Sequence, residues 1–234
     1  MIKGIIFDFG GTLDTGGEHW SHVISDGWKK AGVAADEALF REAYVYGEQE
    51  LERTLHILPQ HNLSDLLDIK IQLELQYLAQ TGHFPPAMVE EKAKEIAAYC
   101  YSVAKEKISQ TSKILAQLSE KYPMVVVSNF YGNLETVLKD LDILKYFKKV
   151  IDSAKEGIRK PDSALFEKGI KALGFKAEEV LVVGDSYRHD IIPSQKLGCQ
   201  TLLLEGKGWE ESPLAHEGKS IRELAEILKY LESA

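Results

Sequence analysis

Four short polar clusters carry residue types that together could transfer a phosphoryl group. They contain Asp8, Ser128 with Asn129, Lys160, and Asp185 with Asp190. An aspartate carboxylate can attack phosphorus and form an aspartyl-phosphate, and a divalent cation would offset the repulsion between that carboxylate and an anionic phosphate. Lys160 and Ser128 would hold the phosphoryl oxygens while negative charge is redistributed.

Each cluster also has a purely structural interpretation when it is taken alone. Ser128, Asn129 and Asp185 are residue types that commonly cap helices. An isolated lysine such as Lys160 is more often a solvated surface residue. The chemical interpretation therefore depends on the clusters meeting in space, and so on the elements that position them.

Short runs of Val, Ile and Leu alternate along the chain with longer amphipathic segments. Such runs are typical of strands buried on both faces of a parallel sheet. Strands are expected at residues 2–7, 124–127, 180–183 and 201–204, with a further short one at 149–152, and helices at 112–121 and 164–173. This order predicts an α/β fold with a Rossmann-like, doubly wound parallel sheet. Ligands of such sheets bind at the carboxyl ends of the strands, where three of the four clusters lie.

Residues 15–107 interrupt this alternation. They contain several long helical patterns and no convincing buried strand. Residues 69–75 alternate like a strand, but consist of good helix formers, so a helix is expected there. The residues around Pro85 and Pro86 indicate a loop between helices. We therefore predict a core domain of residues 1–14 and 108–234 and an inserted, all-helical domain of residues 15–107 that could act as a lid.

Composition narrows the class of protein. The chain has 234 residues and a formal net charge of −8, with 44% hydrophobic and 27% charged residues. These values are typical of a soluble globular protein, and the acidic balance argues against a nucleic-acid partner. No segment has the length of a membrane span or the pattern of a signal peptide. Cys100 and Cys199 lack metal-ligand spacing, so reduced thiols and a cytoplasmic location are expected.

With the four motifs in this order, the chain resembles the hydrolases of the haloacid dehalogenase superfamily. The first motif of that family, Asp-x-Asp-x-Thr after a strand, corresponds to Asp8, Gly10 and Thr12. The other three correspond to Ser128, to Lys160 followed by Pro161, and to Asp185 and Asp190 within GDSYRHD. Each motif alone arises easily by chance, but the ordered set is specific. The helical insertion matches the cap domain carried by one branch of the family.

The resemblance implies a role for each matched position. The catalytic residues would be Asp8 as nucleophile, Thr12, Ser128 and Lys160. The substrate-binding residues would be Gly11, Ser128, Asn129 and Lys160. We add His19 to them because it lies just after the first motif, although it is not a motif position. Magnesium would be held by Asp8, the backbone carbonyl of Gly10 and Asp185, while Asp190 would orient the metal shell or Lys160. The implied activity is that of a magnesium-dependent hydrolase of phosphatase type, which acts on a small phosphorylated metabolite through an aspartyl-phosphate.

Gly10 departs from the family pattern. In family phosphatases, the carboxylate at this position protonates the leaving group and then activates water. Such general acid–base catalysis typically contributes ~10²–10⁴-fold. Turnover of esters with poor, alkoxide-type leaving groups should therefore fall by a factor of that order unless another group substitutes.

Three sources of compensation are conceivable. His19 or His22, which follow the first motif, could donate a proton. A residue of the insertion, such as Arg53 or His56, could face the substrate. The substrate could instead have a good leaving group, which needs little protonation. The aromatic residues that could line the pocket are Trp20, Phe130 and Tyr131.

Other branches of the family supply alternative functions. Haloacid dehalogenases replace the second aspartate and work without metal, whereas the acidic pair Asp185 and Asp190 favours magnesium here. Phosphonoacetaldehyde hydrolases carry a small residue like Gly10, bind magnesium, and use a cap lysine as a Schiff base; Lys29 and Lys30 are the early candidates for that lysine. A further alternative is a protein that binds a phosphorylated ligand with weak or no turnover, against which the intact nucleophile argues.

Overall fold

The computed structural model describes residues 1–209 and 218–233. Its centre is a parallel sheet with the strand order β3-β2-β1-β4-β5-β6. The strands are β1 (Gly4–Phe7), β2 (Met124–Ser128), β3 (Lys149–Asp152), β4 (Val180–Gly184), β5 (Gln200–Leu204) and β6 (Lys219–Ile221). The predicted doubly wound parallel sheet is confirmed, and so are the five strands expected from the apolar runs.

The strand order places the ends of β1, β2 and β4 side by side. β1 lies in the middle of the sheet, where Phe7 is paired with Val126 of β2 on one side and with Val183 of β4 on the other. The residues that follow these three strands therefore meet at one edge of the sheet. This is the switch point at which ligands of open α/β sheets bind.

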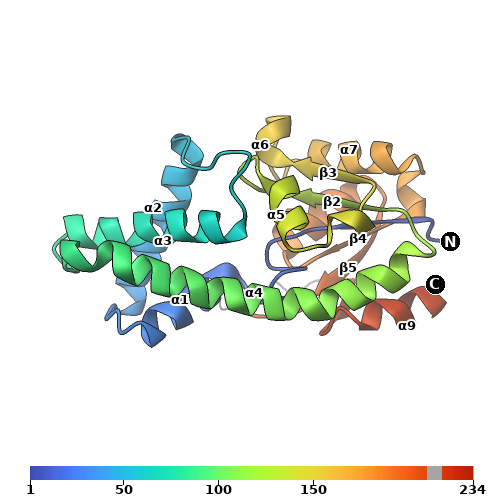
Figure 1. Cartoon of the computed structure of the whole chain (residues 1–234). Helices are drawn as coiled ribbons and strands as arrows, with labels where there is room; N and C mark the ends of the chain where they lie inside the picture. Colours follow the sequence, from blue (N-terminus) through green and yellow to red (C-terminus); the bar gives the residue numbers. More distant parts are fainter. Residues whose placement is uncertain (210–217, 234) are drawn as a thin grey trace.

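Helices cover the sheet (Figure 1). In the core these helices are α5 (Leu134–Asp140), α6 (Ser153–Glu156), α7 (Ala164–Leu173), α8 (Ile192–Lys196) and α9 (Glu226–Ser233). The helix α7 coincides with the helical pattern expected at residues 164–173.

Burial on both faces explains why the strands are apolar at every position. Along β1, Ile5 and Phe7 join one buried cluster, while Ile6 joins another together with Leu165 and Phe166 of α7. Because successive side chains of a strand point to opposite faces, a strand covered on both sides has no position that can be polar without penalty.

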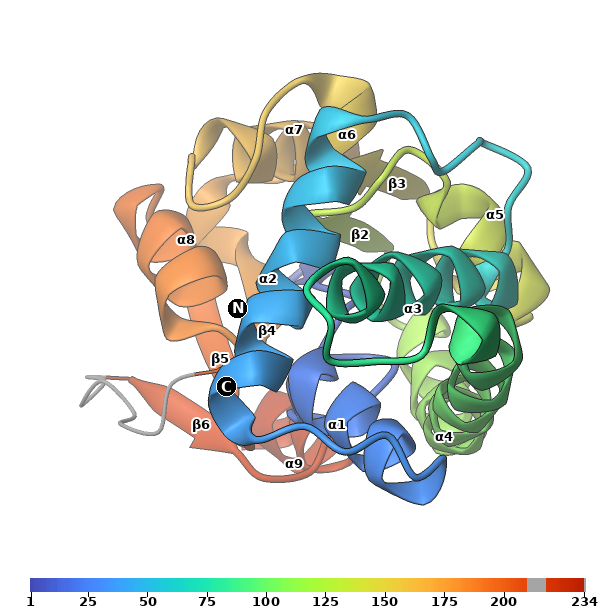
Figure 2. The same cartoon turned by 90° about the vertical axis from the view of Figure 1, so that its left-hand side faces the viewer.

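The insertion after β1 is helical. It contains α1 (Trp20–Lys30), α2 (Glu37–Arg53), α3 (Leu63–Gln80) and the first part of α4 (Val89–Ser119). The helix expected at residues 69–75 lies within α3 and is confirmed, and residues 15–107, all of them described, contain no strand. Figure 2 shows α2, α3 and the near end of α4 gathered in front of the sheet.

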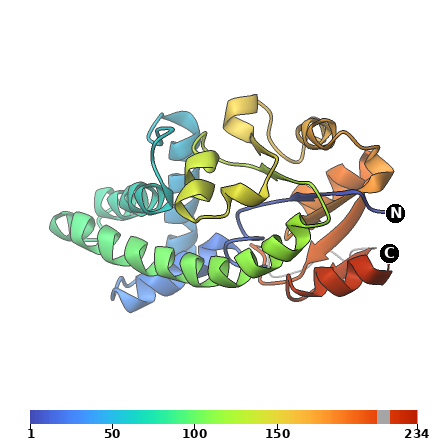
Figure 3. The same cartoon turned by 45° about the vertical axis from the view of Figure 1, so that its right-hand side comes forward.

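The helix α4 is continuous from the insertion into the core. Figure 3 shows it running from the outer end of the insertion along the sheet. Its buried residues extend over its whole length, from Val89 to Leu118. The helix expected at 112–121 is the last part of this longer helix, and the boundary expected near residue 108 lies inside it. The division into core and cap stays a prediction. Within the described residues, no helix is both long and apolar enough to cross a membrane.

Candidate active site

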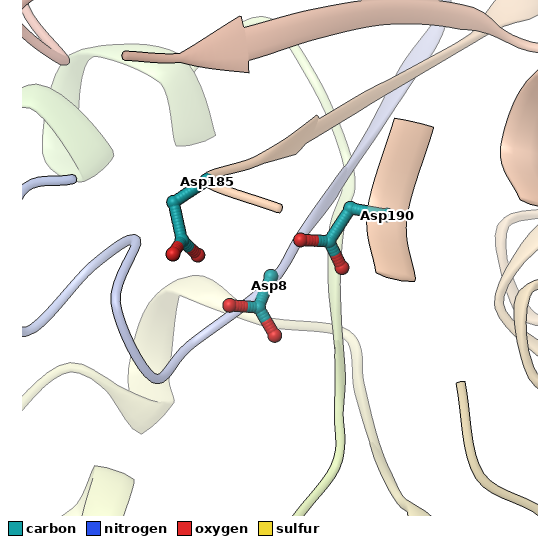
Figure 4. A group of neighbouring side chains, drawn as sticks. All are labelled: Asp8, Asp185 and Asp190. Carbon is teal, nitrogen blue, oxygen red and sulfur yellow. The ribbon is translucent and has the colours of Figure 1, made fainter. Parts of the chain in front are cut away.

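Three aspartates converge at the carboxyl ends of β1 and β4. Figure 4 shows the carboxylates of Asp8, Asp185 and Asp190 lying close together. One oxygen of each lies within 4.8 Å of the others. Asp8 and Asp190 are buried, and Asp185 is partly exposed. The backbone N–H of Asp8 donates to Val183 O at 2.9 Å, so the sheet itself fixes the start of the first motif.

Lys160 lies between two of these carboxylates. Its Nζ is 2.6 Å from Asp8 Oδ1 and 2.7 Å from Asp190 Oδ1. Burial opposes its charge, but Asp190 and Asp8 outweigh burial and raise the pKa of Lys160 above its usual value. The lysine therefore stays cationic. Asn129 holds its backbone on both sides: Lys160 N donates to Asn129 Oδ1 at 2.8 Å, and Asn129 Nδ2 donates to Lys160 O at 3.1 Å.

Two hydroxyls contact the Asp8 carboxylate. Ser128 Oγ donates to Asp8 Oδ1 at 3.0 Å. Thr12 Oγ1 lies 3.0 Å from Asp8 Oδ2 and 2.9 Å from Asp185 Oδ1, and accepts a hydrogen bond from Asp185 N at 3.1 Å. Because a hydroxyl has one hydrogen to donate, Thr12 gives it to one of the two carboxylates at a time. Thr12 thus links the first motif to the end of β4.

Three carboxylates and one ammonium lie in this small volume, which leaves an excess of negative charge. Burial, together with Asp8 and Asp190, raises the pKa of Asp185 well above its ordinary value. Burial also raises the pKa of Asp190 to about 6, although Lys160 opposes that rise. Hard carboxylate oxygens are the donors that Mg²⁺ prefers in proteins. The described residues therefore fit a divalent cation held by Asp8 and Asp185.

The two glycines of the first motif have different steric surroundings. Gly11 has φ +95°, and a Cβ there would lie 2.5 Å from Asp185 Oδ2, so this position requires glycine. At Gly10, a Cβ would meet only Trp20 Cδ1 and Nε1, both at 3.9 Å, which is ordinary van der Waals contact. Sterically, the backbone at Gly10 has room for a side chain.

Asp14 is a buried carboxylate beside this loop. Its Oδ1 accepts from Gly11 N at 2.8 Å, and its Oδ2 accepts from Trp20 Nε1 at 2.9 Å. Burial raises the pKa of Asp14 to about 7. Because both of its oxygens are engaged, Asp14 fixes the motif loop and the indole that borders Gly10.

A cavity of about 1500 Å³ opens from the aspartates to the inserted helices. Of the predicted site residues, those that line it are Asp8, Gly10, His19, Ser128, Asn129, Lys160, Asp185 and Asp190. Gly11 and Thr12 are buried and are not part of this lining, and the Gly11 N–H is already donated to Asp14. The three aromatic residues expected near the pocket, Trp20, Phe130 and Tyr131, also line it.

The residues expected to replace the missing carboxylate differ in their placement. His19 and His22 line the cavity, whereas Arg53 and His56 do not. Burial lowers the pKa of His19 to about 4, and the ring caps α1 by accepting from Ser21 N. His19 is thus neutral near pH 7, and its ring is engaged in the fold. His22 Nε2 lies 2.9 Å from Gly208 O.

The wall of the cavity opposite the aspartates was not anticipated from the sequence. It includes Tyr44 and Glu48 of α2, Lys70 of α3 and Trp209 of the loop after β5. Lys70 Nζ is paired with Glu48 Oε1 and lies 4.1 Å from the ring centroid of Tyr44. The lysine within the stretch IKIQLEL gives little indication in the sequence that it lines a cavity, because the packing of α3 on α2 decides which face of α3 is buried.

Comparison with known proteins agrees with the fold and the motifs. A family model for haloacid dehalogenase-like hydrolases matches residues 2–198. The haloacid dehalogenase-like hydrolase domain-containing protein 3 of Danio rerio is 25% identical over 242 residues, which covers 98% of this chain and 97% of that protein. A glyceraldehyde 3-phosphate phosphatase of Methanocaldococcus jannaschii is 38% identical over 96 residues, which covers 39% of this chain and 42% of that enzyme.

Solved structures share the fold over the whole chain. The L-2-haloacid dehalogenase of Xanthobacter autotrophicus, with chloropropionic acid covalently bound, has a TM-score of 0.64 at 15% identity, with 99% of both chains covered. A magnesium-bound hydrolase of Bacillus subtilis has a TM-score of 0.60 at 18% identity, with 98% of both chains covered. At such identities the likeness concerns the fold and not the substrate.

Proposed function

Because this chain belongs to the haloacid dehalogenase-like hydrolase family, we propose that it is a magnesium-dependent phosphatase that hydrolyses a small phosphorylated metabolite through Asp8. The observation that carries this proposal is the surroundings of the Asp8 carboxylate. It faces a cavity of about 1500 Å³ and contacts a cationic lysine, Lys160, at 2.6 Å and the hydroxyl of Ser128 at 3.0 Å. A carboxylate so placed can act as a nucleophile toward a phosphate held by the same two donors.

The proposed reaction has two displacements at phosphorus. An oxygen of Asp8 forms a bond to phosphorus as the bond from phosphorus to the ester oxygen breaks, and the ester oxygen leaves and takes up a proton from water. Water then attacks the phosphorus of the aspartyl-phosphate and loses a proton to the solvent, the bond from phosphorus to the Asp8 oxygen breaks, and inorganic phosphate is released. Lys160 and Ser128 hold the phosphoryl oxygens through both steps.

The candidate metal ligands complete this arrangement. Asp8, Asp185 and the backbone carbonyl of Gly10 would hold magnesium, and Asp190 would orient Lys160 through its contact at 2.7 Å. When bound, the metal supplies positive charge that offsets the repulsion between the carboxylates and the phosphate.

Gly10 predicts which leaving groups are turned over well. Asp14 has a pKa of about 7, but both of its oxygens accept hydrogen bonds from the motif loop. His19 has a pKa of about 4 and carries no proton to donate as an imidazolium near pH 7. Without a poised acid in either position, esters with alkoxide leaving groups should be turned over slowly, and so should the aspartyl-phosphate.

The phosphonatase-like alternative has weaker support. It needs a cap lysine that can lose its proton to form a Schiff base. Lys29 and Lys30 are exposed at the end of α1 and do not line the cavity. Lys70 does line the cavity. Burial favours its neutral form, but the Glu48 carboxylate has the larger effect, raises the pKa of Lys70 and keeps it charged. Binding without turnover is likewise less supported, because it gives no role to a carboxylate aimed into the cavity.

The test is phosphate release from p-nitrophenyl phosphate by the wild type, by Asp8→Asn and by Asp142→Asn, each with magnesium and with a chelator. Asp142 is exposed and outside the cavity, so it is the matched control. We expect Asp142→Asn to equal the wild type, and both to lose activity with the chelator, while Asp8→Asn is inactive throughout. Wild-type rates in freshly prepared Asp8→Asn, before deamidation, would refute the proposal.

A further inference from the structure

Lys70 is a buried charge on the wall of the cavity. It lies in the middle of α3, with 4% of its surface exposed, and it lines the same cavity as Asp8. Burying an ammonium is costly unless its charge and its hydrogen bonds are satisfied. Its partners therefore indicate what the protein does with it.

Among the described residues, Lys70 Nζ has a single hydrogen-bond acceptor, Glu48 Oε1. Its Nζ also lies over the face of the Tyr44 ring, 4.1 Å from the ring centroid. Glu74, one turn further along α3, is buried, but Lys70 donates no hydrogen bond to it. An ammonium has three N–H donors. Lys70 can therefore donate further hydrogen bonds to a molecule in the cavity.

Glu48 fixes the position of this ammonium. Its Oε1 accepts from Lys70, and its Oε2 accepts from Tyr131 OH at 2.7 Å. Tyr131 follows β2 in the core, so the pair is held from both the insertion and the core. Burial alone would raise the pKa of Glu48, but the charge of Lys70 and the hydrogen bonds from Lys70 and Tyr131 have the larger effect and lower it. The pair is thus ionised and, taken together, neutral.

A neutral pair selects the kind of acceptor. A substrate carboxylate beside Lys70 would also lie near Glu48, and the repulsion between like charges would cancel much of its attraction to the ammonium. A hydroxyl or carbonyl oxygen accepts the same hydrogen bond without that repulsion. The site therefore suits an uncharged oxygen on the leaving group.

We propose that Lys70 is a specificity-determining residue that donates a hydrogen bond to a hydroxyl or carbonyl oxygen of the leaving group. The substrates are then phosphate monoesters of small hydroxylated or carbonyl-bearing compounds, in preference to plain alkyl or carboxylated ones. This inference rests on the proposed phosphatase function.

The experiment compares kcat/KM for glycerol 3-phosphate, n-propyl phosphate and 3-phosphoglycerate in the wild type and in Lys70→Met. The matched control is Lys94→Met, an exposed lysine of α4 outside the cavity. Hydrogen bonds from charged donors contribute about 10- to 100-fold. In Lys70→Met, the ratio of glycerol 3-phosphate to propyl phosphate should fall by about that factor. Because each ratio is compared with the wild-type ratio, differences in intrinsic ester reactivity cancel. The ratio in Lys94→Met should not change.

Two results overturn the inference while the phosphatase function stands. One is an unchanged ratio in Lys70→Met with both esters turned over. The other is a wild-type preference for 3-phosphoglycerate over glycerol 3-phosphate. Lys70→Gln, which keeps a polar side chain, repeats the test if the methionine variant unfolds. Failure of both variants to fold would assign Lys70 a structural role and also overturn the inference. Failure of the proposed function itself is recognised separately, because Asp8→Asn would then turn over the esters as fast as the wild type.

Discussion

Replacing Gly10 by aspartate tests whether the missing carboxylate limits this enzyme. A Cβ at Gly10 would be 3.9 Å from the nearest atoms of Trp20, and its backbone is outside the left-handed region, so the change needs no displacement of backbone. The backbone carbonyl of residue 10 is retained. We therefore expect Gly10→Asp to fold and to keep its magnesium affinity.

The size of the gain follows from the surroundings of the new side chain. A fully supported acid–base group contributes ~10²–10⁴-fold. Here the indole N–H that borders the position is already donated to Asp14 Oδ2 at 2.9 Å, so it cannot also orient the new carboxyl. A group without such support realises only part of its effect. We expect a gain of about 10- to 100-fold for alkyl phosphates and almost none for aryl or acyl phosphates.

The assay measures kcat/KM over a series of phosphate esters graded by the pKa of the leaving alcohol. The wild type should show a steep decline toward poor leaving groups, and Gly10→Asp a shallower one. Gly10→Asn is the matched control, because it has the same shape and no transferable proton, and it should keep the wild-type slope. An equal gain with every ester, or the same gain in Gly10→Asn, would refute the reasoning. A loss on all esters with magnesium still bound would mean that Gly10 makes room for the substrate, which favours the phosphonatase-like alternative.

Three further perturbations follow from the same structure. Asp185→Ala should lose magnesium affinity in a titration monitored calorimetrically. Asp190→Ala should lose less, because the Asp190 carboxylate contacts Lys160 and the backbone N–H of Ser186; an equal loss contradicts this division of roles. Lys160→Met removes the cation between two carboxylates and should lower kcat by about 10²-fold or more, while circular dichroism shows an intact fold. An unchanged kcat in this variant would contradict the role given to Lys160. Burial raises the pKa of Glu74 from 4.5 to about 8. Between these two pH values the folded state keeps a proton on Glu74 that the unfolded state has lost. The free energy of unfolding should therefore fall by roughly 3 to 5 kcal/mol as pH rises from 4.5 to 8. Urea unfolding of Glu74→Gln should lack most of this pH dependence, and an undiminished dependence would assign it to other groups.

The sheet and the aspartate cluster were predictable because both depend on local sequence patterns. Apolar runs identify strands buried on both faces, and the carboxyl ends of neighbouring parallel strands must meet, which brings Asp8, Ser128 and Asp185 together. The strand β6 was missed because it has three residues, two of them exposed, and so carries little hydrophobic pattern.

The far wall of the cavity could not be predicted from the same patterns. Whether Lys70 faces solvent or the cavity depends on how α3 packs against α2, and that packing joins residues far apart in the chain. The continuity of α4 was also hidden, because a helical pattern does not reveal where one domain gives way to another. Conversely, Arg53 and His56 had suitable chemistry but lie outside the cavity lining.

The most direct test of the central claim is to identify the phosphorylated residue during turnover. Without a base at Gly10, hydrolysis of the aspartyl-phosphate should be slow enough for it to accumulate, and borohydride reduction of the quenched enzyme would convert a phosphorylated aspartate into homoserine. Mass spectrometry of the peptide that contains residues 7–15 should then find homoserine at position 8 in the wild type, and none in enzyme quenched without substrate. Steady phosphate release with no modification at Asp8, or with the modification at another residue, would contradict the account.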